Sequence, residues 1–168
     1  MEIAPDKEAF LRLVEENKGI IIKICNSYCR DKSDREDLAQ EMIYQLWKSG
    51  HRFNADHKFS TWMYRVALNV AISFYRKKRS GPVVSFTGME MDIEDTTAGA
   101  TEMEENLRLL QVFIKELKEL DRALILLYLE EKTYAEIAEI IGISETNTAT
   151  RLSRIREKLK QYFSSLHK

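Results

Sequence analysis

Polar and basic side chains recur every three or four positions near the C-terminus of this 168-residue chain, at Asn147, Thr150, Arg151, Arg154 and Lys158. On an α-helix, which turns by about 100° per residue, these side chains share one face. Arginine can bind guanine through two hydrogen bonds and asparagine can bind adenine, so this face can read base edges in a DNA major groove. A basic helix whose face is only solvated has the same pattern.

The residues before this face favour the DNA-binding interpretation. Thr133 and Glu136 form a capping box that begins a short helix, and Gly142 is the residue type preferred at a left-handed C-cap. Ser144 is a good N-cap for the last helix. Together they predict a helix-turn-helix. The stripe of the last helix that would pack inward comprises Thr148, Leu152, Ile155 and Leu159.

A second candidate DNA surface lies in the stretch FSTWMYRVALNVAISFYRKKR, residues 59–79. Trp62, Arg65, Asn69 and Arg76 share one face of the expected helix, and a basic run, Arg76-Lys77-Lys78-Arg79, follows. Aromatic rings stack on bases and basic groups bind phosphates, which suits single-stranded DNA. Trp62 as a plain core residue is an equally good interpretation of the wheel. The predicted packing stripe comprises Met63, Val66, Ala67, Val70 and Phe74.

The helix expected before it, SDREDLAQEMIYQLWKSG, carries an acidic face. Ser33 and Glu36 form a capping box that is predicted to begin this helix. Phosphate repels acidic groups, so the face suits a basic protein partner, although an ordinary solvated face explains the spacing better. The residues predicted to point outward are Asp37, Gln40, Glu41 and Tyr44, and those predicted to pack inward are Leu38, Ala39, Met42, Ile43 and Leu46.

Composition places these faces on an all-α protein with two small helical domains. The chain contains only 2 Pro and 6 Gly, and 44% of its residues are hydrophobic. Residues 80–100 lack helical periodicity and contain Gly, Pro and acids, which predicts a flexible acidic linker. The expected domains are 1–80 and 101–168, joined by a linker at 81–100. The expected helices span about 7–16, 20–28, 33–48, 60–78, 101–120, 121–130, 133–142 and 144–162.

Several classes of protein are excluded by what the chain lacks. A net charge of -1 argues against a general polyanion binder, although basic residues gather at 76–79 and after Ser144. No apolar run reaches the roughly 18 residues of a membrane span and no signal peptide is evident, so we expect a cytoplasmic protein without membrane insertion. Cys25 and Cys29 are predicted to be packing thiols. The histidines that form no ligand pattern are His51, His57 and His167.

Three motifs of this chain resemble, in the same order, those of the extracytoplasmic-function group of bacterial sigma factors. They are DREDLAQEMIYQLW, FSTWMYRVALNVAISFYRKKR and TYAEIAEIIGISETNTATRLSRIREKL. The resemblance implies that the protein binds core RNA polymerase, through its β′ clamp and β flap, and directs transcription from promoter DNA. It assigns polymerase binding to Asp37, Leu38, Gln40 and Glu41. It assigns the −10 element to Phe59, Trp62, Arg65 and Asn69, with Arg76, Lys77, Lys78 and Arg79 on the phosphates, and the −35 element to the C-terminal helix pair.

The chain departs from the family pattern at three positions. Thr148 replaces a common apolar residue, Ala149 a common basic one, and Met63 the second tryptophan of housekeeping factors. Many members of the group are held inactive by a membrane-linked anti-sigma protein, and nothing in this sequence identifies such a partner.

Two other classes of function compete with this interpretation. A stand-alone helix-turn-helix regulator of duplex DNA explains the C-terminal pair but leaves the Trp62 face and the acidic helix unused. An enzyme needs a nucleophile motif, a phosphate-binding glycine loop or a Glu-x-x-His pair, and the sequence contains none. We therefore expect no catalytic residue, metal, cofactor or small-molecule substrate.

Overall fold

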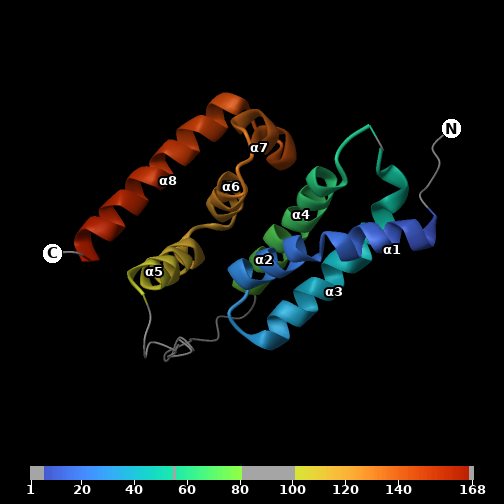
Figure 1. The fold of residues 1–168 in the computed structure, drawn as a ribbon, viewed down its shortest axis with the longest axis horizontal. Coiled ribbons are helices and arrows are strands. Elements are labelled where there is room, and N and C mark those ends of the chain that lie inside the picture. The colour runs from blue at the N-terminus through green and yellow to red at the C-terminus, as the bar shows by residue number, and fades with distance from the viewer. Residues whose placement is uncertain (1–5, 55, 81–100, 167–168) are drawn as a thin grey trace.

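The protein is all-helical in the residues that the structure, a computed structural model, describes: 6–54, 56–80 and 101–166 (Figure 1). The predicted linker, 81–100, lies outside these residues, as does His167. The N-terminal half comprises α1 (Lys7–Glu16), α2 (Lys18–Tyr28), α3 (Lys32–Ser49), the 3-10 helix η1 (Gly50–Arg52) and α4 (Phe59–Ser80). The C-terminal half comprises α5 (Glu102–Glu116), α6 (Glu119–Leu129), α7 (Tyr134–Ile141) and α8 (Glu145–Leu166).

In the N-terminal half, α3 packs against α4 and α2 contacts both. Leu38, Met42 and Leu46 recur every four residues along α3 and are completely buried. The inward position predicted for Ile43 was wrong, because this side chain is 47% exposed. Ile43 lies about 100° around the helix from Met42, beyond the stripe that α2 and α4 cover.

The start of α3 also differs from the prediction. The N-cap is Asp31, whose carboxylate accepts a hydrogen bond from the Asp34 N–H at 2.7 Å. Ser33 already lies inside the helix, so the prediction that it begins α3 was wrong. Both residue types are good N-caps, but the carboxylate of Asp31 satisfies an open N–H group two residues earlier.

The face of α4 that is buried is broader than the predicted stripe. Met63 and Ala67 are completely buried, as expected. The reason for the difference is that α4 packs against α2 and α3 and also against α6 and α7 of the C-terminal half. The additional buried residues are Tyr64, Leu68 and Ala71, whereas Val66, Val70 and Phe74 are only half-buried.

The C-terminal half begins with the predicted capping box. The Thr101 hydroxyl accepts a bond from the Glu104 N–H at 3.2 Å, and the Glu104 carboxylate accepts one from the Thr101 N–H at 3.3 Å. The helix ends at Glu116 rather than near Leu120, because Leu117 and Lys118 are extended. Leu117 is buried and fixes this break between α5 and α6.

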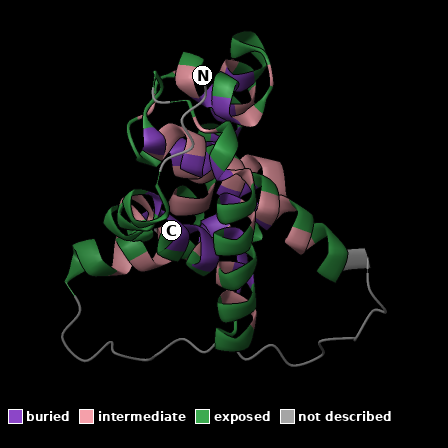
Figure 2. Cartoon of the chain, turned by 90° about the vertical axis from the view of Figure 1, so that its right-hand side faces the viewer, coloured by how far each residue is buried: buried purple, intermediate pink, exposed green. Residues whose placement is uncertain are grey.

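The two halves share one hydrophobic cluster, which contains side chains from both. Helix α6 lies beside α4 at the centre of the molecule (Figure 1), and its Arg122 donates a hydrogen bond to the Ser27 carbonyl of α2. Buried segments gather where the helices meet, and exposed segments follow the outer faces (Figure 2). Across the ranges described, none of the helices has the length and apolar character that crossing a bilayer would require.

Candidate nucleic-acid and polymerase interfaces

The C-terminal helix pair has the predicted helix-turn-helix geometry. Helix α7 begins where the Thr133 hydroxyl accepts the Glu136 N–H at 3.1 Å. It ends at Gly142, whose φ of +83° lies in the left-handed region that suits glycine. The Ser144 hydroxyl then accepts the Asn147 N–H at 3.0 Å at the start of α8. These local bonds set the angle at which α8 leaves the turn.

Helix α8 buries one face and exposes another. Thr148, Leu152 and Ile155 are buried, and the Thr148 hydroxyl donates to the Ser144 carbonyl at 3.0 Å. The buried hydroxyl is therefore satisfied within its own helix. On the other face, the exposed residues of the predicted DNA-reading set are Asn147, Thr150, Arg154 and Lys158.

Arg151, the fifth residue of that set, is partly engaged within the C-terminal half. Its Nη1 lies 3.3 Å from the Asp121 carboxylate on α6, and its side chain is 38% exposed. One guanidinium nitrogen takes part in this bond, and a guanidinium carries five N–H donors, so the bond does not use all of them. Arg156 lies on neither stripe and is held over the Tyr128 ring, 5.7 Å from its centroid.

The structure exposes some residues of the second predicted DNA surface and buries others. Arg65 and Asn69 are exposed on α4. Trp62 is half-buried, with its ring 5.5 Å from Phe53 and 5.5 Å from Phe59. Phe59 itself is buried, so an aromatic surface at this end of α4 is offered by Trp62 rather than by Phe59.

Two residues of the basic run at the end of α4 pair with acidic neighbours. The Arg76 Nε lies 3.1 Å from the Glu119 carboxylate on α6. Lys78 pairs with Asp34 on α3, and this bond raises the pKa of Lys78. Lys77 is exposed on the same turn, while the side chain of Arg79 lies outside the described part of the chain.

The acidic face of α3 is exposed as predicted, at Asp37, Gln40, Glu41 and Tyr44. Leu38, which the sequence groups with the polymerase-binding residues, is completely buried. Its packing holds α3 in place, and it offers no surface to a partner in this conformation.

An apolar extension of this acidic face was missed from the sequence. Ile43, Tyr44 and Trp47 are 47%, 56% and 48% exposed on α3. Trp47 also lies under Lys7, 5.8 Å from its ring centroid, and against Phe10. The three- and four-residue spacing of these side chains was a usable signal, but the wheel assigned Ile43 to the core. The acidic surface therefore continues into an aromatic one.

A shallow apolar groove of about 460 Å³ lies between α5 and the end of α8. Met103 and Leu107 on α5 line it and are 74% and 54% exposed. Leu110, Leu159 and Phe163 complete its apolar wall. This groove is a candidate protein-binding surface that the sequence analysis did not find.

The cysteines are ordinary core residues. Both are free and buried, and burial raises the pKa of Cys25 to about 11 and that of Cys29 to about 12. His51 and His57 are exposed. Among the residues described, no group of three His, Cys, Asp or Glu side chains is placed to hold a metal ion.

Models of known protein families match both halves of the chain. The family model described as sigma-70 region 2 matches residues 13–81, and the one described as sigma-70, region 4 matches residues 107–159. The ECF RNA polymerase sigma factor SigM of Bacillus subtilis (strain 168) is 31% identical, over 82% of this chain and 85% of the relative. The chain belongs to the extracytoplasmic-function group of the sigma-70 family.

Other matches cover nearly the whole length of both this chain and the similar protein. The ECF RNA polymerase sigma factor SigW of Bacillus subtilis (strain 168) is 28% identical, over 96% of this chain and 92% of the relative. A structure of CnrH in complex with the cytosolic domain of CnrY has a TM-score of 0.67 at 20% identity, covering 96% of this chain and 91% of that one. The sigma factor RpoE with the anti-sigma factor NepR from Bartonella quintana has a TM-score of 0.67 at 19% identity, over 94% and 96% of the two chains. These structures share the fold.

The family resemblance and the all-α fold predicted from the sequence are thus confirmed. As a sigma factor, the protein directs promoter-specific transcription initiation with core RNA polymerase and promoter DNA as partners. Sigma factors are not enzymes, which agrees with the expectation from the sequence. The helix-turn-helix falls in region 4, and the Trp62 face and acidic helix fall in region 2.

Proposed function

We propose that this sigma factor divides promoter recognition between two exposed faces, with α8 of domain 101–168 on the −35 element and α4 of domain 1–80 on the −10 element. Residues 81–100 join the two domains. The observation that carries this proposal is the arrangement of α8, which buries Thr148, Leu152 and Ile155 and exposes a polar and basic face on its other side.

For the −35 element, the proposed readers are on this exposed face. Asn147 and Arg154 have hydrogen-bonding groups that match adenine and guanine edges. Lys158 lies further along the helix and suits a phosphate. Arg151 contributes when the bond to Asp121 is exchanged for a bond to a base. Thr150 completes the set.

For the −10 element, Trp62, Arg65 and Asn69 are the proposed contacts to bases, and the basic run is the proposed contact to phosphates. Support comes from the exposure of Arg65 and Asn69 and from the half-buried ring of Trp62. Phe59 supports Trp62 from below through the 5.5 Å ring contact. Its role is therefore to position Trp62 in the present conformation.

For core polymerase, we propose that Asp37, Gln40 and Glu41 dock on the β′ clamp, together with the adjoining apolar surface of α3. An acidic stretch of α3 next to exposed Tyr44 and Trp47 fits a partner surface that has both basic and apolar groups. The apolar groove between α5 and α8 supports a second contact, with the β flap. We also propose that the protein acts in the cytoplasm, where core polymerase works, and that it can bind an anti-sigma factor.

Transcription with purified components tests this proposal. The protein is mixed with bacterial core RNA polymerase and a genomic promoter library, and start sites are mapped by sequencing. Start sites that need both components, with shared −10 and −35 sequences, are the expected result. Tight duplex binding by the protein alone, without polymerase-dependent start sites, would overturn the proposal.

A matched pair of variants tests the polymerase surface. Asp37→Arg reverses a charge on the proposed docking face and should reduce co-purification with core polymerase. Glu16→Arg makes the same change at an exposed position in the last turn of α1, where a basic residue suits the helix dipole, and should not. Equal recovery of polymerase with both variants would remove Asp37 from the surface.

A further inference from the structure

A buried phenylalanine of α1 lies next to the proposed −10 surface. Phe10 is 3% exposed, and it is the one buried residue of α1, all ten residues of which the structure describes. Its apolar neighbour Leu11 is 48% exposed. Phe10 precedes residues 13–81, which match sigma-70 region 2, so the family model does not include it. Phe10 is therefore the side chain that holds α1 most deeply in the domain.

The Phe10 ring contacts three other aromatic rings. Its centroid lies 6.3 Å from that of Trp62, with the ring planes at 73°. The corresponding values are 6.0 Å and 81° for Phe59, and 5.7 Å and 67° for Trp47. All three pairs are edge-to-face, which is a favoured geometry for aromatic rings. Phe10 thus joins α1 to α3 and α4 through one cluster of rings.

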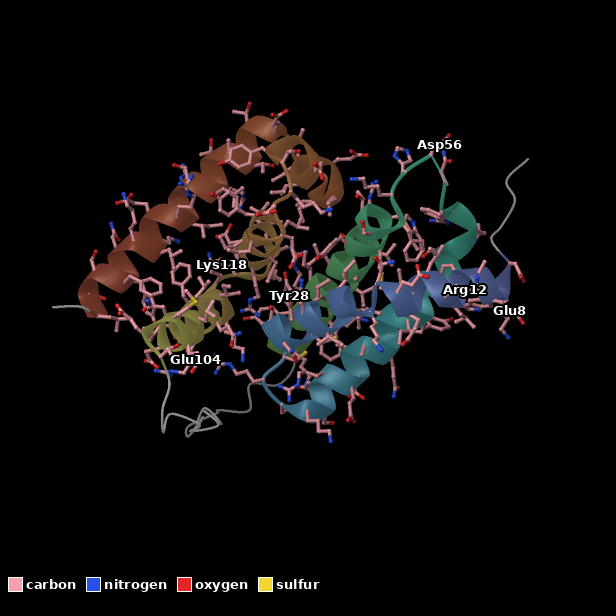
Figure 3. All side chains as sticks on the ribbon, viewed as in Figure 1. Glu8, Arg12, Tyr28, Asp56, Glu104 and Lys118 are labelled. Carbon is pink, nitrogen blue, oxygen red and sulfur yellow. The ribbon has the colours of Figure 1, made fainter. Side chains whose placement is uncertain are left out.

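This cluster lies at one end of the molecule. Glu8 and Arg12, on either side of Phe10 in the sequence, are labelled at this end, as is Asp56 in the loop before α4 (Figure 3). The loop leads into the first turn of α4, which contains Trp62. The ring cluster is therefore adjacent to the part of α4 that we propose to read the −10 element.

The Trp62 ring is bounded by three other rings and is still partly exposed. Phe53 and Phe59 each lie 5.5 Å from it, and Phe10 lies on it from α1. Phe53 and Phe59 are near Trp62 in the sequence, whereas Phe10 belongs to another helix. A side chain that is already held in place loses little conformational freedom when it binds a ligand. The orientation of Trp62 thus depends on Phe10 as well as on its local neighbours.

Gly50 shows how closely the Phe10 ring is fitted. A Cβ at position 50 would lie 3.0 Å from Cε2 and 3.4 Å from Cδ2 of Phe10. The backbone there has a φ of −56° and a ψ of −30°, which alanine adopts without strain. Glycine therefore makes room for the ring, and the backbone does not need it. A single methyl group at this position would displace Phe10 without removing it.

We propose that Phe10 is a positioning residue for −10 recognition, because it holds the Trp62 ring in the orientation that stacks on an unpaired base. Gly50 leaves the space that Phe10 needs. This inference rests on the proposed role of Trp62 at the −10 element. Packing alone would also bury Phe10, but it predicts a loss of stability without a specific effect on −10 binding.

Holoenzyme binding to forked promoter DNA tests this role. The promoter is one whose start site has been mapped with purified components. One fragment carries the −10 element as a single strand beside the −35 duplex, and a second fragment ends before the −10 element. The ratio of the two affinities measures the contribution of the −10 bases. A change that only destabilises the protein affects both fragments alike and leaves the ratio unchanged.

Three single variants should lower this ratio. Trp62→Ala should lower it about 5- to 150-fold, which corresponds to the loss of one stacked base. Phe10→Leu should lower it about 2- to 12-fold, because an edge-to-face ring contact has an effect of that size. Gly50→Ala should lower it in the same direction, since the added methyl group moves the Phe10 ring.

Two variants are matched controls. Phe113→Leu makes the same change at a buried ring of region 4. Gly19→Ala adds a methyl group where no atom lies within 4 Å. Neither should alter the ratio. Circular dichroism confirms that each variant keeps its helices, and Gly50→Ala replaces Phe10→Leu in the comparison below if Phe10→Leu does not fold.

The double variant separates positioning from packing. If Phe10 acts through Trp62, adding Phe10→Leu to Trp62→Ala should change the ratio by less than about twofold. An equal loss from Phe10→Leu with and without Trp62 would overturn this inference alone, as would an unchanged ratio in both Phe10→Leu and Gly50→Ala. An unchanged ratio in Trp62→Ala would overturn the proposed role of Trp62, and this inference with it.

Discussion

Replacing Gly142 with alanine tests whether backbone conformation fixes the turn of the helix-turn-helix. Gly142 has a φ of +83°, and a Cβ built there meets no atom within 4 Å. The substitution therefore introduces left-handed strain without a steric clash. That strain is about 1–2 kcal/mol for an L-residue. For a protein of this size, it should lower the Tm by about 2–8 °C.

Gly19→Ala is the matched control. Gly19 lies in α2 without a left-handed φ, and a Cβ there also meets nothing within 4 Å. Alanine restricts the unfolded chain and should stabilise the protein by about 0.4–1 kcal/mol. Thermal unfolding followed by circular dichroism measures both variants. The reasoning is refuted if the two variants shift the Tm in the same direction, or if Gly142→Ala is as stable as the unchanged protein.

Three further predictions concern other parts of the molecule. Asp31→Ala should lower the free energy of unfolding by about 1 kcal/mol. The Asp34 N–H lowers the pKa of Asp31, so this loss of stability should be present above about pH 4 and disappear as the pH falls through the lowered pKa. Urea titrations at several pH values measure it. An equal loss at all pH values would contradict the prediction. Cys25 and Cys29 should resist alkylation at about pH 8 until the protein unfolds, which mass spectrometry can follow; rapid labelling of the folded protein would show that they are not buried. In the holoenzyme, Arg151→Ala should weaken binding to the −35 element roughly 5- to 150-fold. Asp121→Asn should strengthen this binding by up to about fivefold, because it releases Arg151 from its ion pair. Unchanged affinity in both variants would exclude Arg151 as a −35 contact.

Local signals in the sequence predicted the elements of the C-terminal half well. Thr101, Thr133, Ser144 and Gly142 act through bonds or backbone angles within three residues, so their effect is visible without the rest of the fold. The same reasoning misplaced the start of α3, because Asp31 and Ser33 are both suitable caps and only the geometry distinguishes them.

Contacts between distant segments could not be predicted in this way. A helical wheel identifies a face that is apolar, but Tyr64 and Leu68 are buried because a second domain also packs on α4. Arg122 depends on a carbonyl 95 positions earlier in the chain. In sequence it is an ordinary helical arginine, and nothing around it indicates that it would be enclosed.

The candidate site was predictable in part. The wheel of α8 placed Thr148, Leu152 and Ile155 inward correctly, since one face packs within a single domain. Leu159 of the same predicted stripe and Arg151 of the opposite face are each only half-buried. On α4 and α3, Phe59 and Leu38 were grouped with exposed neighbours by family resemblance, although their side chains are buried. Only the packed structure shows whether a motif residue forms a surface or supports that surface from beneath.

The aromatic cluster of the N-terminal half allows unfolding to be followed by intrinsic fluorescence, without an added label. The chain's two tryptophans, Trp47 and Trp62, both lie against Phe10, so tryptophan fluorescence reports on region 2 alone. Circular dichroism reports on the helices of both regions. Because one hydrophobic cluster joins the halves, the two signals should change at the same denaturant concentration. A fluorescence transition displaced from the dichroism transition would measure how independently region 2 melts.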